Sequence, residues 1–170
     1  MIQSMLSEIQ TLLGQVATTA ISSSSAGDDV FEVYAFSLVL EAARREGADI
    51  QYENVSGAFQ GTCTFRTSPG HIWSERRPYT HAVLSLTGKP PLEAHLGVML
   101  QGSSGTPHEA DIAVIPRSEG LTCRLNRAEP RASTALLTIE CKFYTTPLPL
   151  GMGRGFVGLA QSSARRRPFS

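Results

Sequence analysis

The chain has 170 residues, of which 41% are hydrophobic, so it can bury the core of one compact domain but not of two ordinary ones. It contains no run of about 18 apolar residues that could span a membrane, and its N-terminal stretch is acidic where a secretory signal would be basic. A soluble, cytoplasmic protein is therefore expected.

The charge is balanced overall but unevenly distributed along the chain. Residues 1–112 carry 6 Lys and Arg against 12 Asp and Glu, whereas residues 113–170 carry 9 against 3. This distribution indicates a basic surface for an anionic partner, although an ordinary surface whose charges sum unevenly would give the same counts.

The N-terminal part of the chain predicts two helices with a linker between them. The first covers 2–19, where apolar residues recur at helical spacing. Residues 22–29 (SSSSAGDD) read as a flexible linker in which Asp28 or Asp29 caps the next helix. That second helix covers 30–47 and ends at Gly47. Its expected apolar face consists of Phe31, Tyr34, Phe36, Leu38, Val39 and Ala42.

From Ile50 onward the pattern changes to short strand-like runs separated by Gly and Pro. The expected strands are 60–66, 71–74, 81–86, 92–101, 108–115 and 135–144. Residues 93–101 and 108–115 flank the turn-rich GSSGTP and predict an antiparallel hairpin. The basic stretch 117–133 is a connection that can hold a short strand or helix, and 151–163 a final helix.

The stretch ALLTIECKFY (135–144) places an acid and a base in an otherwise apolar strand. Because side chains alternate across a strand, Glu140 and Lys142 share one face while Cys141 points toward the core. A solvent-exposed pair on a half-wet sheet is the structural alternative. Asp111, at the start of another apolar strand, supplies a second acid, and two carboxylates on neighbouring strands are suitable ligands for Mg²⁺.

The order Asp111, 28 intervening residues, then Glu140-Cys141-Lys142 resembles the PD-(D/E)xK nuclease superfamily. The resemblance covers about residues 30–163. It implies a restriction-endonuclease-like α/β core, that is, a mixed α+β fold with a central mixed β-sheet flanked by helices. To this core the chain adds an N-terminal helix (1–21), a linker (22–29) and a basic tail (164–170).

By the same resemblance the chain is a divalent-metal-dependent endonuclease, a hydrolase that cleaves phosphodiester bonds in nucleic acid, with DNA the first expectation. The resemblance implies that Asp111 and Glu140 are the metal ligands, that Glu32 is an auxiliary acid at the metal, and that Lys142 is the catalytic base or phosphate clamp. The cofactor is Mg²⁺ or Mn²⁺. Bacterial restriction, repair and mobile-element defence are settings in which such proteins act, and a homodimer or larger assembly remains open.

The basic residues near the C-terminus are candidate nucleic-acid contacts. Arg154 lies near the start of the expected last helix, and Arg165, Arg166 and Arg167 form the tail, where a solvated surface explains them equally well. Residues 153–158 also match G-x-G-x-x-G, but the chain ends too soon for a ribose-binding acid.

Other chemistry-bearing residues favour structural roles. The histidines, His71, His81, His95 and His108, lack zinc-ligand spacing. Glu93 is expected to be an exposed charge at the start of a strand, and Glu109 to point away from Asp111 if its strand is regular. Three widely spaced cysteines predict reduced thiols.

A second function from a different class competes with the nuclease. The chain can be a non-catalytic member of the same fold that serves as an interaction module in a larger assembly. Zero net charge favours this alternative, whereas the presence of Asp111, Glu140 and Lys142 together opposes it.

Overall fold

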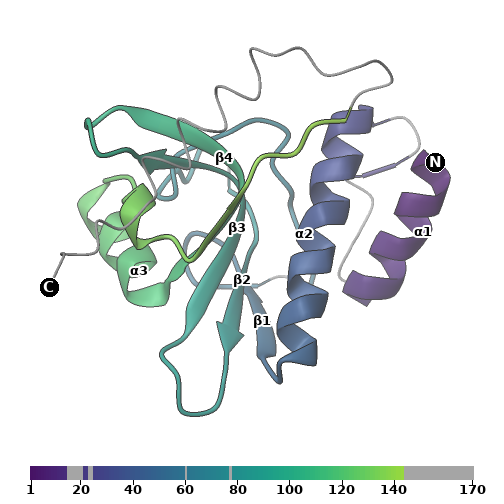
Figure 1. Cartoon of the computed structure of the whole chain (residues 1–170), viewed down its shortest axis with the longest axis horizontal. Coiled ribbons are helices and arrows are strands. Elements are labelled where there is room, and N and C mark those ends of the chain that lie inside the picture. Colours follow the sequence, from purple (N-terminus) through teal and green to yellow (C-terminus); the bar gives the residue numbers. More distant parts are fainter. Residues whose placement is uncertain (15–20, 23–24, 60, 77, 144–170) are drawn as a thin grey trace, which may run out of the picture.

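The computed structural model describes residues 1–14, 21–22, 25–59, 61–76 and 78–143. These residues form a mixed α+β fold with a five-stranded antiparallel sheet (Figure 1). In chain order the elements are α1 (Ile2–Leu13), α2 (Gly27–Arg45), β1 (Asp49–Glu53), β2 (His81–Ser85), β3 (Leu92–Gln101), β4 (Pro107–Pro116), α3 (Arg117–Asn126), a short 3₁₀ helix η2 (Ala132–Thr134) and β5 (Leu137–Ile139).

The strands lie in the order β1-β2-β3-β4-β5, and each neighbouring pair is antiparallel. The expectation of a mixed sheet is therefore wrong for the described residues. Helix α2 covers one face of the sheet with α1 outside it, and α3 covers the other face (Figure 1). With helices on both sides, β4 is buried on both faces over most of its length.

Helix α1 packs on α2 through its buried apolar residues Met5, Ile9 and Leu13. It ends at Leu13 because Gly14 takes a positive φ of 67°, a conformation that glycine adopts at little cost. The predicted continuation to residue 19 is thus wrong at Gly14, and residues 15–20 lie outside the described part.

Helix α2 begins three residues earlier than expected, at Gly27, within the predicted linker. Asp28 and Asp29 therefore lie in its first turn rather than at the cap, where their charges still favour the positive end of the helix dipole. The helix ends at Arg45, and Glu46 and Gly47 complete the predicted stop.

The buried face of α2 differs from the predicted one. The fully buried residues are Val30, Val33, Phe36, Ser37 and Leu40. Leu38 is 44% exposed, so only part of the prediction is correct. Apolar residues occur almost all round this helix, and the sheet and α1 together decide which of them are covered.

The segment between β1 and β2 contains no strand among its described residues, so the predicted strands 60–66 and 71–74 are wrong. It runs instead along the part of β3 that extends beyond the pairing with β2, where Gly70 forms an isolated bridge with Val98. The amide of Gly70 donates to Gly97 O and the amide of Met99 donates to Gly70 O, each at 3.1 Å. Pro69 and Gly70 in this segment disfavour a longer ladder.

The predicted hairpin is confirmed by β3 and β4, which pair from Leu92↔Pro116 to Gln101↔Pro107. Its side chains change face halfway along. On β3, Ala94 and Leu96 join the core under α2, whereas Val98 and Leu100 join the core under α3.

The same change of face occurs on β4. Ile112 and Val114 face α2, whereas Ala110 lies in the core on the α3 side. The change falls at Gly97 on β3, which has φ 60°, and at Asp111 on β4, and the register places these two residues opposite each other.

Strand β5 is shorter than predicted and includes only Leu137–Ile139. The next residues leave the sheet, and Phe143 packs on the N-terminal turn of α2, with its ring centroid 5.9 Å from that of Phe31. Gly27 permits this approach, because a Cβ there would lie 2.7 Å from the Phe143 ring. The contact brings segment 140–142 next to α2.

Three of the predicted features lie outside the described residues: the helix 151–163, the tail 164–170 and Arg154 with Arg165, Arg166 and Arg167. Among the described helices none combines the length and the apolar character that a membrane crossing requires.

Candidate functional site

Asp111 is the first of the predicted site residues, and it lies on β4 where the hairpin changes face. Its side chain is 5% exposed. Asp111 Oδ2 accepts a hydrogen bond from the backbone amide of Cys141 at 2.5 Å. This bond fixes the segment after β5 against the middle of β4.

Glu140 and Lys142 lie on that segment, beside Asp111. Cys141 is buried toward α2 with Ile139 and Phe143, as the predicted alternation requires, although these residues follow the strand rather than belong to it. Lys142 Nζ contacts Glu140 Oε1 and lies 3.9 Å from Asp111 Oδ2. One ammonium group is thus shared by the two carboxylates that the sequence predicts as metal ligands.

Glu32 approaches the same place from the first turns of α2. Burial, with the negative charges of Asp111, Asp29 and Glu109, raises the pKa of Glu32 to about 7, against the opposing charge of Lys142. The structure therefore brings the helix acid into the electrostatic neighbourhood of Asp111, as predicted.

Glu109 belongs to this group as well, so the prediction that it points away from Asp111 is wrong. Burial raises the pKa of Glu109, and the charges of Asp111 and Glu140 contribute. Because Ala110 faces the core on the α3 side, Glu109 points to the opposite face, toward α2. We call Glu32, Glu109, Asp111 and Glu140 the acidic cluster.

Burial and mutual repulsion favour the protonated state of Glu32, Glu109 and Asp111. Burial and the negative charge of Glu140 raise the pKa of Asp111. The hydrogen bond from the Cys141 amide and the charge of Lys142 lower it. Lys142 is the cation that balances part of this charge.

The donor atoms of the acidic cluster suit a hard divalent cation, since Mg²⁺ and Mn²⁺ prefer carboxylate oxygens and water. In the described part of the chain, however, no three His, Cys, Asp or Glu side chains are grouped as ligands around one point. Glu140 would have to exchange the Lys142 ammonium for the metal. The residues thus fit a divalent ion in chemistry, with Asp111 and Glu140 as the pair that already shares one cation.

Three of the four histidines lie outside this group. His71 contacts Glu129 and stacks on Trp73, with ring centroids 4.6 Å apart. His81 and His95 lie in the core on the other face of the sheet. The prediction that Cys141 is a packing residue agrees with its burial.

The sequence interpretation missed a second charged group, which is buried between β3 and α3. Glu93 has no exposed surface, so its prediction as an exposed strand-end charge is wrong. Arg124 donates to both Glu93 carboxylate oxygens, at 2.6 and 2.9 Å, and His95 Nε2 lies 3.1 Å from Glu93 Oε2. Tyr79 Oη lies 3.0 Å from His95 Nδ1 and extends the network.

Arg117 and His81 complete the buried network. Arg117 donates to both oxygens of Glu53 at 3.0 Å, and His81 Nε2 lies 3.8 Å from a carboxylate oxygen of both Glu53 and Glu93. The alternation of Glu93 and His95 within an apolar strand was the signal for this network, because two polar residues on one buried face need partners.

No protein-family model, curated protein or solved structure matches the chain. The functional interpretation therefore depends on the motif order in the sequence and on the geometry of the acidic cluster.

Proposed function

We propose that the chain is a divalent-metal-dependent nuclease that hydrolyses phosphodiester bonds in nucleic acid, with DNA as the preferred substrate. The observation that carries the proposal is the meeting of Asp111, Glu140 and Lys142 at one point, where one ammonium serves two carboxylates. These three residues are also the ones that resemble the PD-(D/E)xK motif.

In this proposal Asp111 and Glu140 hold the metal ion, and Glu32 assists from α2. When bound, Mg²⁺ or Mn²⁺ supplies a Lewis acid and lowers the pKa of a coordinated water. Asp111 is kept in place by the Cys141 amide, so its carboxylate is oriented before substrate arrives. Glu140, at 25% side-chain exposure, has the freedom to change partner.

Lys142 has a role of its own once Glu140 turns to the metal. Its ammonium then lies beside the substrate phosphate, where it neutralises developing charge or orients the attacking water. Because Lys142 is not a ligand, its loss is expected to stop cleavage without removing the metal site.

A cleavage assay tests this proposal. Purified protein is incubated with plasmid and with single strands in Mg²⁺, Mn²⁺ or EDTA, and Lys142→Ala is compared with the wild type. We expect cleavage only with a divalent ion and a loss of about 100-fold or more in the variant. Lys89→Ala removes the same charge from the exposed β2–β3 turn and should cleave as the wild type does.

Cleavage in EDTA, or full activity of Lys142→Ala, would contradict the proposal. The non-catalytic interaction module is the second candidate, and one observation favours it: the described acidic residues are not grouped as three ligands around a single point. Absence of cleavage on every substrate with either ion would leave this candidate as the better account.

A further inference from the structure

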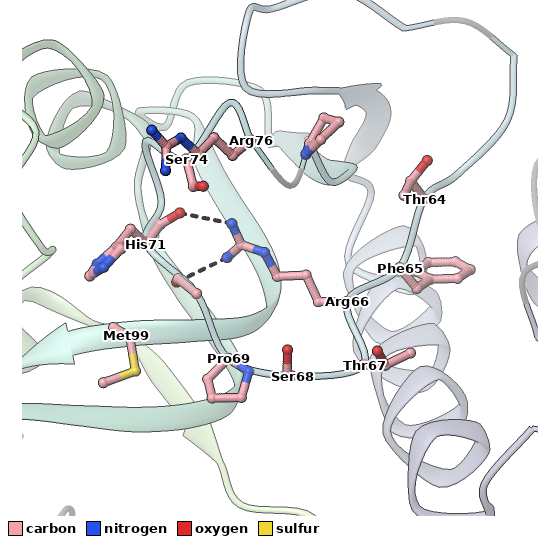
Figure 2. Close-up of a pocket in the computed structure, with 12 residues that line it drawn as sticks. Thr64, Phe65, Arg66, Thr67, Ser68, Pro69, His71, Ser74, Arg76 and Met99 are labelled. Atoms are coloured by element: carbon pink, nitrogen blue, oxygen red, sulfur yellow. Dashed lines mark hydrogen bonds between the residues drawn. The ribbon is translucent and has the colours of Figure 1, made fainter.

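A cavity of about 810 Å³ opens beside β3, between the strand and the segment that runs along the part of it beyond the pairing with β2 (Figure 2). Such a volume lies within the range of sites that take small molecules or single nucleotide units. The lining residues include Arg66, Ser68, Pro69, Arg76, Pro78 and Met99.

The lining of this cavity is cationic and rich in hydroxyl groups. It contains two arginines, one histidine and four Ser or Thr residues, and no carboxylate among its described residues. Pro69, Pro78 and Met99 add apolar surface. The combination suits a ligand with an anionic group attached to a flat or apolar body.

The two arginines have different roles. Arg66 is 8% exposed, donates to the carbonyl oxygens of Gly70, Gly97 and His71, and lies 3.5 Å above the ring centroid of Tyr79. These bonds make it a part of the wall. Arg76 is exposed at the rim beside Ser74 (Figure 2) and has no hydrogen bond or ion pair within the described chain, so it remains available to an anion.

One wall of the cavity lies on the same face of the sheet as the acidic cluster, while the wall from His71 to Arg76 belongs to the segment that packs toward α3. Val98 and Ala110 point into the core under α3, so their neighbours Met99 and Glu109 point to the opposite face. Met99 lines the cavity, and it pairs directly with Glu109 of the acidic cluster.

The cavity and the acidic cluster are separated by about the width of one strand, β3. A Cβ at Gly97 would lie 3.3 Å from Arg66 Cβ, and the register places Gly97 opposite Asp111. Since neighbouring strands are spaced about 4.8 Å apart, a chain of nucleotides could cross β3 from the cavity to Asp111 within about 10 Å.

We propose that the cavity binds one unpaired nucleotide of the substrate strand, next to the phosphate held at the acidic cluster. This inference rests on the proposed function and adds a substrate class to it: nucleic acid with a single-stranded segment at the cleavage site. Arg76 and the hydroxyl groups contact the phosphate and sugar, and Pro69, Pro78 and Met99 contact the base. A paired base in a duplex cannot enter such a cavity without leaving its partner.

Binding of a fluorescein-labelled oligothymidine strand, measured by anisotropy in EDTA, tests the inference without any cleavage. Arg76→Ala should weaken binding about threefold to tenfold and lower the slope of log affinity against log salt by about 0.7, the value for one contact to a single strand. Ser68→Trp fills the cavity without changing the charge. It should weaken the binding of the single strand more than the binding of a matched duplex.

Lys89→Ala is the control, because it removes one exposed positive charge from the far turn and should leave affinity and slope unchanged. Thermal melting of each variant verifies the fold. Equal binding by the wild type, Arg76→Ala and Ser68→Trp would overturn the inference, as would equal competition by thymidine monophosphate and the strand.

The two proposals fail in different ways. If the cleavage assay shows no cleavage while Arg76→Ala and Ser68→Trp weaken the binding of the strand, the cavity is a nucleic-acid site in a non-catalytic protein. If cleavage occurs while both variants bind as the wild type does, the cavity assignment is wrong and the nuclease stands.

Discussion

At the scale of single residues, His81 carries the clearest consequence for stability. It is 1% exposed, and neither ring nitrogen has a hydrogen-bond partner in the described structure. Burial, together with the charge of the nearby His95, lowers the pKa of His81 to about 2 against the attraction of Glu93. The ring is therefore neutral in the folded protein.

This neutrality predicts a loss of stability in mild acid. The unfolded chain takes up a proton at His81 below about pH 6.5, whereas the folded chain does not, so the free energy of unfolding should fall as the pH drops below that value. The limit for one group is about 1.4 kcal/mol per pH unit. We expect His81→Gln to lose less stability than the wild type between pH 8 and 5.5, by about 1 kcal/mol.

Urea unfolding of both proteins at the two pH values measures this difference. Glu32, with its pKa near 7, contributes in the opposite direction over the same window, but it is present in both proteins and cancels. An identical pH dependence in wild type and variant would show that His81 is protonated in the folded state.

At the scale of elements, the packing of α3 on β3 depends on one glycine. Gly120 is buried on α3, and a Cβ there would overlap Glu93 Oε2, which is already bound by Arg124. The helix can approach the strand this closely only because position 120 has no side chain.

Gly120→Ala should therefore destabilise the protein by about 2–4 kcal/mol in chemical denaturation, because the helix must retreat or Glu93 must lose its partners. Helix propensity alone predicts the opposite sign, a gain of about 1 kcal/mol. Leu125→Ala on the exposed side of the same helix is the control and should change the stability by less than about 0.5 kcal/mol. A gain on Gly120→Ala would show that the helix is loosely packed.

The elements also show which parts of the fold are accessible from sequence. The β3–β4 hairpin has a turn-rich loop between two regular runs, so its strands were predicted within one residue. The stretch 60–74 has apolar residues but no partner strand, and tertiary packing against the edge of β3 overrides its strand propensity. Helix α3 lacks a strong apolar stripe, since its buried side faces charged groups, and the sequence left it open between helix and strand.

Some residues of the candidate site were predicted from the sequence, and others were missed. Asp111, Glu140, Lys142 and Glu32 were singled out because their order resembles a known motif, and the structure brings them close together. Glu109 was missed although residues two apart on a regular strand share a face, so its spacing from Asp111 was itself a signal. Glu93 was missed because its buried partner, Arg124, lies 31 residues away in the sequence.

At the scale of the whole molecule, the acidic cluster joins α2, β4 and the segment after β5, so a cation bound there should stabilise the entire fold. If Asp111 and Glu140 are its ligands, Mn²⁺ at 100 times its dissociation constant adds about 2.7 kcal/mol, or a rise of several degrees in melting temperature. The variants Asp111→Asn and Glu140→Gln should gain little stability from the same ion.

A thermal-shift titration from EDTA into Mn²⁺ or Mg²⁺ measures this effect. Asp49→Asn, which removes an exposed carboxylate of β1, is the control and should shift as the wild type does. Equal shifts in all four proteins would place the bound cation elsewhere.

The change of face at Gly97 and Asp111 also locks the alignment of the two strands. An ordinary hairpin can slip by two residues and keep every side chain on its own side of the sheet, because the pattern repeats with a period of two. Here a slip of any size would separate the two crossing points and turn core residues of one strand toward solvent or charge. Asp111 thus occupies the one position on β4 that the hairpin itself marks, and the Cys141 amide, which donates to Asp111 Oδ2, holds the segment that carries Lys142 against that position.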